Sequence, residues 1–442
     1  MHTCENLSNM LNPDSIPDKE PLLRVGIILP EDNEITLKLD LFNAKNAKLK
    51  AEGKVIETNK NPEIKIENGN LNCNGILVQN LKIEQDEIDS YVIVNDVIAG
   101  RGFHWAKKID VKLTYRLIIS VVENKIILIN ELPLEEYLAC VATSEMSAEC
   151  PDSYIEAQTI VARSWMLANV EQKHVKFGFD VCNDDCCQRF QGVNNITEYS
   201  RKAAQSTKGI VLMHKNKIAD ARYSKSCGGI MEKFENLWEN LPLEYMQNKS
   251  DAQFECDVNL QNESDFKNWV TTSPAAFCSP HFIPEKNLHK YLGNVDEDGK
   301  YFRWAVEVSN EDLVNNLNVK LKLKIKTVLA LKPLKRAGSG RLLELEIEYI
   351  NDDDSIKSMI IYKDYQIRRL IHKKFLFSSA IIIEPIYNDN QRIPSFFKYI
   401  GAGWGHGAGL CQIGGLGMSL AGYSTQEIVY HYYPNTILKK IY

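Results

Sequence analysis

The sequence lacks the features that would place the chain across a membrane or on nucleic acid. Its 442 residues contain no run of about eighteen apolar residues, so no membrane span is predicted. The net charge is −6, from 52 basic and 58 acidic residues, and phosphate binding favours a basic surface instead. Nucleic acid is therefore excluded as the main partner, whereas a polysaccharide, which proteins bind through hydrogen bonds and aromatic faces, is not.

A recognisable export signal is also absent. The first residues contain no basic segment followed by an apolar core, so they do not resemble a secretory signal. Residues 1–21 are polar and include three prolines, and we expect them to form a disordered lead-in. If this start is genuine, the expected location is cytoplasmic.

Internal repeats of 20 to 50 residues and low-complexity tracts are missing too. The length exceeds one ordinary core, so we expect two or three lobes or one elaborated domain. The cysteine count of 11 is odd, and most cysteines are dispersed. A reduced compartment or a metal site is favoured over a disulfide framework.

The periodicity of apolar residues predicts an α+β fold. Residues 22–130 alternate as strands do, and a hairpin is expected over 110–130 with its turn at Glu123 and Asn124. From Pro133 the spacing becomes helical, and Pro151 opens a second, longer helix. We therefore predict β-rich flanking regions around a helical catalytic core.

Further elements follow this core. Strands joined at Lys215 and Asn216 are expected from residue 209, and an irregular insertion near 240–300. Residues 319–361 are predicted to be β, with the lysines between 320 and 326 on a solvated strand face. Ser424 with Glu427 fits a capping box for a last helix. The domain boundaries we predict are 1–21, 22–130 and 131–442.

Glu145 is the first candidate for chemistry. The helical pattern that begins at Pro133 ends near it, and the negative end of a helix disfavours a charged carboxylate. That environment suits a general acid at neutral pH. From position alone, an ordinary solvated glutamate at a helix end is the better supported interpretation.

A possible metal site follows the second helix, in HVKFGFDVCNDDCCQ. A histidine and thiolates bind zinc tetrahedrally, and His174, Cys182 and Cys187 form a credible set of ligands with a fourth ligand or water. Cys186 is left out because adjacent cysteines rarely both reach one ion. A set of free thiols in a loop is an equally good interpretation of the spacing.

Two glycine-containing segments complete the candidates. In GAGWGHGAGLCQIGGLG, glycine at every second position from 401 to 409 predicts a strand with one bare face, with Trp404, His406 and Gln412 as sugar-contacting groups. It contains no dinucleotide fingerprint and no nucleophile elbow. A packing seam without a ligand is at least as well supported. In YSKSCGG, Cys227 is best explained by a turn, since no pattern pairs it with a base.

These motifs together resemble the SpoIID/LytB family of bacterial cell-wall proteins. LPLEEYL followed by SEM and EAQTIVARSW resembles one part of the family pattern, and GAGWGHGAGLCQIGGLGMSLAGYSTQEIVYHYYP resembles its closing motif. YSKSCGG and AGSGRLLELEI fit the intervening pieces. The resemblance runs from about Leu22 to Tyr442 and is weakest near 240–300.

The resemblance implies a function. The family includes lytic transglycosylases, which cleave peptidoglycan glycan strands with one carboxyl, in contrast to the paired carboxylates of ordinary glycosidases. The glutamate of the Ser-Glu-Met triplet corresponds to Glu145, and a structural zinc would be held by His174, Cys182 and Cys187. The family's location is the cell envelope. It also contains enhancers of N-acetylmuramoyl-L-alanine amidases, so a non-catalytic binding role is the alternative, and zinc-dependent hydrolysis is a third.

The resemblance also implies a set of substrate contacts and a groove. The residues concerned lie in the second helix and in the two glycine-containing segments: Gln158, Arg163, Tyr223, Ser224, Ser226, Gly228, Trp404, His406 and Gln412. Gln158 and Arg163 do not share a helix face, so one is expected to meet the glycan and the other to support the fold. We expect a groove formed by Glu145, the 223–229 turn and the 401–417 segment. Ser147 and Cys186 depart from the family pattern, which has proline and histidine there.

Overall fold

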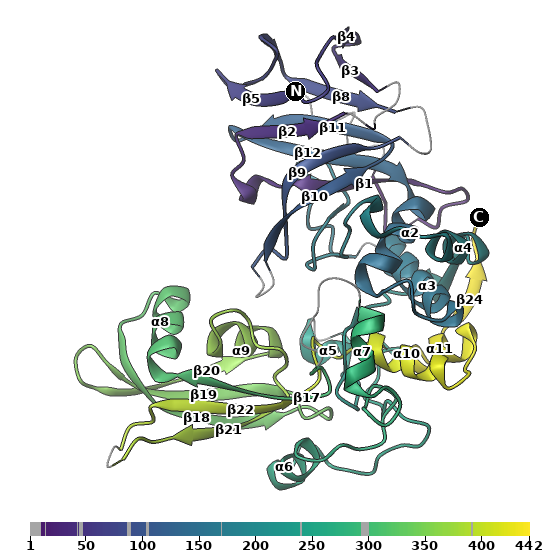
Figure 1. Ribbon diagram of the computed structural model, residues 1–442. Helices are drawn as coiled ribbons and strands as arrows, with labels where there is room; N and C mark the ends of the chain where they lie inside the picture. The colour runs from purple at the N-terminus through teal and green to yellow at the C-terminus, as the bar shows by residue number, and fades with distance from the viewer. Residues whose placement is uncertain are drawn as a thin grey trace. The chain divides into compact units, whose positions relative to one another are not determined.

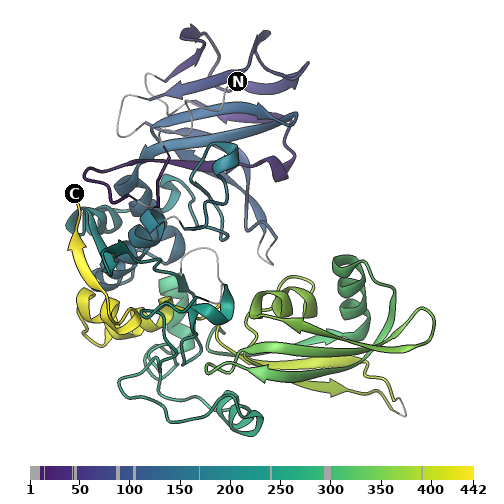
Figure 2. The same cartoon turned by 180° about the vertical axis from the view of Figure 1, so that it is seen from behind.

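The chain folds into two compact units that both contain helices and sheets (Figures 1 and 2). The structure is a computed structural model that describes residues 10–13, 15–41, 43, 47–85, 90–102, 106–168, 170–238, 241–292, 300–389 and 392–442. The first unit comprises Met1–Asp220, Tyr291–Val295 and Ile437–Tyr442, and the second comprises Ala221–Lys290 and Asp296–Thr436. The predicted α+β class is confirmed.

The N-terminal part of the first unit is built from two sheets, drawn in purple and blue in Figure 1. One sheet has the order β13-β1-β12-β11-β8-β3-β4 and the other the order β10-β9-β2-β5-β6-β7. Their strands are β1 (Leu22–Ile28), β2 (Thr36–Asp40), β3 (Lys48–Ala51), β4 (Lys54–Ile56), β5 (Glu63–Glu67), β6 (Asn70–Cys73), β7 (Ile76–Val78), β8 (Asn80–Glu84), β9 (Val92–Ala99), β10 (Lys107–Leu113), β11 (Arg116–Val122), β12 (Lys125–Pro133) and β13 (Val181–Cys182). Alternation of apolar and polar residues along β2, β8 and β9 buries one side of each strand.

The predicted hairpin over 110–130 is confirmed from residue 116 onward, but its expected start at residue 110 is wrong. β11 and β12 pair in antiparallel register, and Glu123 and Asn124 adopt φ values of 51° and 59°, as a two-residue hairpin turn requires. The expected start at residue 110 instead belongs to β10, which pairs with β9. Tyr115, with φ of 61°, lies between β10 and β11 and breaks the extended run there.

The helical core of the first unit begins where predicted. α2 (Leu134–Glu145) follows Pro133, and α3 (Asp152–Ala168) follows Pro151. The other elements of this unit's core are η1 (Pro30–Asp32), η2 (Val175–Phe177), η3 (Val193–Asn195), α4 (Glu198–Ser206), β14 (Ile210–His214), β15 (Lys217–Ile218) and β24 (Ile437–Lys440). β14 pairs with β24 and, through the predicted turn at Lys215 and Asn216, with β15.

The second unit contains two more antiparallel sheets, ordered β17-β22-β21 and β18-β19-β20. Their strands are β17 (Arg303–Ser309), β18 (Ile325–Arg336), β19 (Leu342–Asn351), β20 (Ile356–Tyr362), β21 (Ile381–Ile386) and β22 (Phe396–Ala402). α8 (Asn310–Leu321) and α9 (Asp364–Ile371) lie on one side of these sheets (Figures 1 and 2). Leu313 and Leu317 of α8 and Ile367 and Leu370 of α9 share one apolar core with the strands.

The predicted strand beginning at Val319 is wrong. Residues up to Leu321 complete α8, and Lys322 ends the helix in the left-handed conformation with φ of 55°. The signal lies upstream, because the Ser309 hydroxyl accepts a hydrogen bond of 3.0 Å from the Asp312 amide and caps the helix. The lysine run therefore crosses from a helix end into β18.

The remaining elements of the second unit are short. They are β16 (Tyr223–Ser224), α5 (Phe234–Leu237), α6 (Glu263–Val270), β23 (Leu410–Cys411), α10 (Gln412–Leu420) and α11 (Thr425–Tyr432), with α7 (Glu285–Leu292) crossing the boundary between the units in sequence. The region predicted to be an irregular insertion is mostly loop and contains α6 and α7. The capping box of Ser424 and Glu427 is confirmed at the start of α11.

Part of the expected disordered start makes defined contacts. Residues 1–9 and 14 lie outside the described residues. Glu20 forms an ion pair of 2.7 Å with Lys208, and the Pro21 carbonyl accepts a hydrogen bond from the Leu134 amide. In the described ranges, no helix combines the length and the apolar character needed to cross a membrane.

Candidate functional site

Glu145 is the last residue of α2, as its sequence position predicts. Its side chain is buried, and the residue is 8% exposed. The backbone N–H of Arg189 donates a hydrogen bond of 3.1 Å to Oε1 of Glu145. The expectation of a solvated helix-end glutamate is therefore wrong, because a segment 44 residues further along covers this carboxylate.

A second acidic side chain lies in the segment that covers Glu145. Asp185 forms an ion pair with Arg189, with Nε 3.1 Å from Oδ1. Burial raises the pKa of the Asp185 carboxyl to about 6, with the charge of Glu145 adding to the rise and Arg189 opposing it. Neither Asp185 nor Arg189 belongs to a recognisable spacing pattern, so neither was predicted from the sequence.

The predicted metal ligands come together, and Cys186 joins them. We call His174, Cys182, Cys186 and Cys187 the His174 cluster, in which the ligand atoms all lie within 4.8 Å of one another. Cys187 Sγ is 3.4 Å from His174 Nε2, and Cys186 Sγ is 3.9 Å from the same nitrogen. Cys186, which we left out of the predicted ligands, thus lies beside them, because the turn after β13 brings both adjacent thiols near His174.

The donor set of the His174 cluster fits a soft divalent cation. Three sulfurs and one imidazole nitrogen are the ligands of a closed tetrahedral zinc site. The His174 ring stacks on Phe179 with centroids 5.0 Å apart, which orients the plane of the imidazole. The Cys182 and Cys187 thiols and the His174 imidazole lower the pKa of the Cys186 thiol, so a thiolate is favoured at that position.

Of the two α3 candidates, Arg163 supports the fold. Its side chain is fully buried, and its guanidinium contacts Glu135 through Nε at 3.0 Å and Nη2 at 2.5 Å. Nη1 also donates to the Ile210 carbonyl. An arginine enclosed by these acceptors presents no surface to a glycan, so the predicted substrate contact is not supported by its environment.

Gln158 is also fully buried, but its amide is only partly used. Its Oε1 accepts a hydrogen bond of 3.3 Å from the Tyr154 hydroxyl. Among the described residues, Nε2 of Gln158 has no hydrogen-bond partner. A buried amide donor without a partner costs free energy. Any group that brings a hydrogen-bond acceptor to Nε2 would therefore be stabilised there.

The glycine-rich segment is not the strand we predicted. Only Gly401 lies in β22, whereas Gly403, Gly405, Gly407 and Gly409 have φ values between 69° and 98°. These glycines form a loop that residues with side chains would strain. The predicted close approach is nevertheless present, because a Cβ on Gly407 would lie 2.4 Å from Cζ of the Arg341 guanidinium.

The two glycine-containing segments, 223–229 and 401–417, lie side by side in the second unit. Tyr223 and Ser224 of β16 pair in parallel register with Leu410 and Cys411 of β23. Ser226 and Trp404 exchange backbone hydrogen bonds of 3.0 and 2.7 Å. The two segments are therefore neighbours within the second unit. Glu145 belongs to the first unit, so the groove that we predicted around all three stays a prediction.

The predicted sugar contacts in this loop differ in their access to solvent. Ser226 and Gln412 are buried, and the Ser224 and Ser226 hydroxyls accept hydrogen bonds from the amides of Gly407 and Gly228. Tyr223, Trp404 and His406 are half-buried. Trp404 stacks on Phe377 with centroids 4.0 Å apart. The half-buried aromatic and imidazole rings are the groups able to present a face to a sugar.

His406 is held as a neutral imidazole. Its Nδ1 accepts a hydrogen bond of 3.1 Å from the Ala408 amide, and its ring meets the Trp238 ring edge to face at 4.8 Å. Burial lowers the pKa of His406 well below its ordinary value, and the positive charges of Arg222, Arg368 and Arg341 add to this effect. A neutral ring can accept a proton or bind a metal, but near pH 7 it does not supply positive charge.

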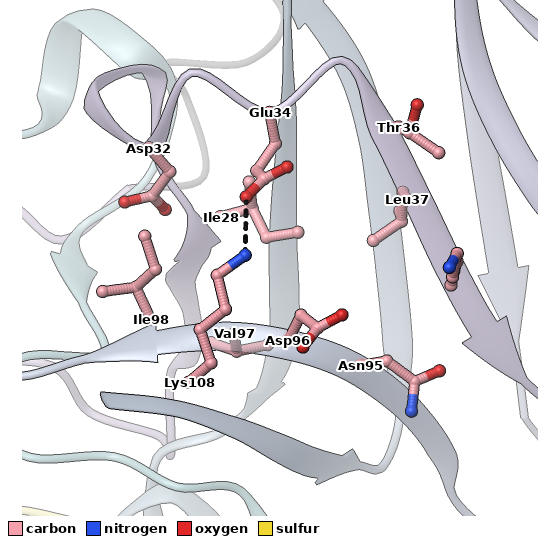
Figure 3. Close-up of a pocket in the computed structure, with 11 residues that line it drawn as sticks. Ile28, Asp32, Glu34, Thr36, Leu37, Asn95, Asp96, Val97, Ile98 and Lys108 are labelled. Carbon is pink, nitrogen blue, oxygen red and sulfur yellow. Dashed lines mark ion pairs between the residues drawn. The ribbon is translucent and has the colours of Figure 1, made fainter.

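A separate surface pocket lies in the first unit, between the start of β2 and the β9–β10 hairpin (Figure 3). Lys108 points toward Glu34 across it, with Nζ 3.6 Å from Oε1. None of the predicted site residues lines this pocket. It therefore gives no support to the glycan site.

Two protein families match different parts of the chain. Residues 122–214 match the Stage II sporulation protein family, SpoIID. Residues 232–409 match a domain of unknown function, DUF8618. The first match contains Glu145 and the His174 cluster, and the second contains Trp404 and His406. The SpoIID match is thus much shorter than the resemblance that the motifs indicate.

Similar curated proteins are longer than the parts that match. An uncharacterized protein of Brachyspira hyodysenteriae is 28% identical over 115 residues, which cover 26% of this chain and 31% of that protein. The amidase enhancer of Bacillus subtilis is 24% identical over 304 residues, which cover 67% of this chain and 39% of that protein. The chain thus spans about a third of the length of these relatives. The SpoIID match and the similarity to the amidase enhancer together support a SpoIID/LytB-like family for this chain.

Proposed function

We propose that the chain cleaves glycan strands of peptidoglycan in cell-wall remodelling, by a lytic transglycosylase-type reaction with Glu145 as acid and base. The observation that carries this proposal is the position of Glu145. It ends α2 inside the SpoIID match, and the Arg189 amide holds its buried carboxylate. A single carboxyl in a fixed position is what this reaction requires.

The reaction needs two proton transfers at that carboxyl. In the first, the Glu145 carboxyl donates its proton to the glycosidic oxygen while the bond from this oxygen to C1 of the muramic acid breaks. In the second, the carboxylate takes the proton of the C6 hydroxyl as this oxygen bonds to C1. The product is a 1,6-anhydro sugar, no water is consumed, and the carboxyl returns to its initial protonation state.

The proposed cofactor is one structural zinc ion in the His174 cluster. Its ligands would be His174, Cys182 and Cys187, as the resemblance implies, together with Cys186, which the geometry adds. Such an ion would brace the loop that continues to Arg189, and the protein residues alone would carry the proton transfers. Chelator-resistant cleavage by a folded chain would argue against zinc-dependent hydrolysis.

The proposed location is the cell envelope, where peptidoglycan is found. The support is the family match and the name of the Bacillus subtilis relative. The proposed sugar contacts are Tyr223, Trp404 and His406, because these rings keep some exposed surface. Fractionation of the producing cells, with the chain detected by antibody, tests the location, and recovery only with soluble cytosolic proteins would contradict it.

The decisive experiment compares Glu145→Gln with the unaltered chain on glycan strands stripped of peptide. The amide keeps the size of the side chain and an acceptor for the Arg189 N–H, but it cannot transfer a proton. Release of anhydro-sugar, measured by mass spectrometry, is expected to fall by about a hundredfold or more. Glu149→Gln, an exposed glutamate four residues further on, is the control and should retain the rate. Unchanged release by folded Glu145→Gln rejects the assignment.

The second candidate is an enhancer of a cell-wall amidase with no turnover of its own. The observation that favours it is the similarity to the amidase enhancer of Bacillus subtilis. The chain is added to an N-acetylmuramoyl-L-alanine amidase with intact peptidoglycan, and release of peptide is followed. Stimulation that Glu145→Gln retains, without any anhydro-sugar, would support the enhancer function over the lytic one.

A further inference from the structure

Three cysteines and an aspartate that are far apart in the sequence meet in the interior of the second unit. They are Cys227, Asp251, Cys278 and Cys411, called here the Asp251 cluster, and their ligand atoms all lie within 4.8 Å of one another. Each residue is at most 3% exposed. Asp251 and Cys278 lie inside the DUF8618 match, whereas Cys227 and Cys411 lie just outside its two ends.

We propose that the Asp251 cluster is a second metal site, a closed structural site for zinc. The donor set is three sulfurs and one carboxylate oxygen, which zinc accepts in four-coordinate sites. A zinc–sulfur bond of about 2.3 Å in a tetrahedron places two sulfurs about 3.8 Å apart. Cys227 Sγ and Cys278 Sγ are separated by 3.8 Å, far beyond a disulfide bond of about 2.05 Å.

Two of the three sulfurs of the cluster receive backbone hydrogen bonds, as thiolate ligands do. Sγ of Cys411 accepts from the amides of Cys227 at 3.2 Å and Gly414 at 3.3 Å. Sγ of Cys227 accepts from the Gly229 amide at 3.4 Å. Cys411 also caps the N-terminus of α10, where the helix dipole favours negative charge. A neutral thiol in an apolar core needs none of these donors.

Neighbouring groups orient the aspartate as outer ligands orient a metal-bound carboxylate. Oδ2 of Asp251 accepts from the Cys278 amide at 3.1 Å, and Oδ1 accepts from the Tyr432 hydroxyl at 2.7 Å. Gly414 makes room for this arrangement, since a Cβ there would lie 2.5 Å from Oδ2 of Asp251. A buried carboxylate beside three sulfurs is costly without a cation, and a divalent ion removes that cost.

The site would join four loop or terminal segments of the second unit. Cys227 follows β16, Cys411 ends β23, and Asp251 and Cys278 lie in the region with little regular structure between α5 and α7. A metal bond that joins these segments would contribute folding free energy directly. This site is independent of the proposed glycan chemistry, because none of its residues is assigned to that reaction.

The test counts metal in the full chain with the His174 cluster removed. A background variant carries His174→Ala and Cys187→Ser, is produced with zinc, and is analysed by plasma mass spectrometry. One equivalent of zinc per chain is expected to remain. Adding Asp251→Asn and Cys278→Ser should remove it, whereas adding Cys73→Ser, a fully buried cysteine of the first unit, should not. Zinc content that is insensitive to the two cluster changes overturns the proposal.

A second measurement leaves the Asp251 cluster unaltered, so it decides the matter if the cluster variants do not fold. The background variant is stripped of zinc and refilled with cobalt. Ligation by three sulfurs is expected to give an intense sulfur-to-cobalt absorption in the near ultraviolet and tetrahedral bands in the visible. Absence of these bands from folded chain, or a non-reduced mass two hydrogens lower with Cys227 and Cys278 linked, contradicts the metal site.

Discussion

The backbone amide of Arg189 donates to Oε1 of Glu145 over 3.1 Å, and Arg189 lies two residues after Cys187 of the His174 cluster. The same loop therefore carries candidate metal ligands and a hydrogen bond to the candidate acid. The side chain of Arg189 forms an ion pair with Asp185, which lies between Cys182 and Cys186 in the sequence. A change in the conformation of the His174 cluster is thus expected to move the Arg189 amide and to alter its hydrogen bond to Glu145.

Removing the metal is expected to slow glycan cleavage. Hydrogen bonds to a charged group are worth about 1.5–3 kcal/mol, so loss of the Arg189 contact corresponds to a decrease of roughly 10- to 150-fold in kcat. The KM should change much less, because the loop is not among the proposed sugar contacts. The measurement is anhydro-sugar release by the Cys187→Ser chain, with near-ultraviolet circular dichroism to confirm the fold.

The control for this effect is Cys256→Ser, which removes an exposed cysteine outside both clusters. It should retain the parent rate and the parent metal content. A folded Cys187→Ser chain that loses one zinc but cleaves at the parent rate would show that the His174 cluster does not position Glu145.

Arg163 is expected to be a determinant of stability. It pairs with Glu135 in two contacts at full burial, so Arg163→Met leaves Glu135 without its main partner. Breaking such a pair costs about 3–5 kcal/mol, which urea unfolding measures. Arg201→Met removes the pair with Glu136, where Arg201 is 41% exposed, and should cost about 0–1 kcal/mol. Weakened glycan binding with parental stability would restore the substrate role for Arg163.

Gly228 tests the contact between the two glycine-containing segments. Its φ is 81°, and a Cβ there would lie 2.6 Å from the Gly403 amide nitrogen. Gly228→Ala therefore combines backbone strain with a steric clash, and we expect a loss of about 2 kcal/mol or more. Gly422→Ala is the matched control, because its φ is 91° and the described residues leave open space around it. Equal losses in the two variants would show that the close approach does not matter.

The sequence predicted the elements whose signals are local. Proline before α2 and α3, the capping box of α11 and the turn at Glu123 and Asn124 act within a few residues, and all are present. The glycine alternation misled us because a period of two also describes a loop whose alternate residues have positive φ. Only the backbone conformation distinguishes a strand from such a loop. In the folded chain, Trp304, Arg341 and Arg222 lie close to three of these glycines.

The parts of the sites that the sequence missed depend on contacts between distant segments. A general rule about adjacent cysteines left Cys186 out of the predicted ligands, but the turn in this chain places its thiol beside them. Cys227 was assigned to a turn because its partners lie 24, 51 and 184 residues away, as the positions Asp251, Cys278 and Cys411 show. No spacing motif covers such separations, although the odd and dispersed cysteines did favour a metal site.

The stability of the second unit is expected to fall as the pH falls below about 6.5, the ordinary pKa of histidine. Burial and the charges of Arg222, Arg368 and Arg341 lower the pKa of His406 in the fold, so it stays neutral there while the unfolded chain takes up a proton. The unfolded state then binds more protons, which makes the free energy of unfolding decrease toward acid pH. The contribution of His406 to the stability is complete above about 6.5, the pKa of histidine in the unfolded chain. It is lost as the pH falls from there toward the lower pKa that His406 has in the fold.

His406→Asn isolates this effect, because the amide oxygen can take over the hydrogen bond from Ala408 but does not titrate. Thermal unfolding at pH 7.5 and 5.5 should give a smaller decrease in Tm for this variant than for the parent chain. Burial also lowers the pKa of His431 to about 4, but that residue is present in both chains and its contribution cancels in the comparison. His281→Asn, which removes an exposed histidine, should leave the parent decrease unchanged. If His406→Asn shows the full parental decrease in Tm, a group other than His406 takes up the proton on unfolding. The pH dependence of the unfolding free energy that is due to one residue must disappear when that residue is removed.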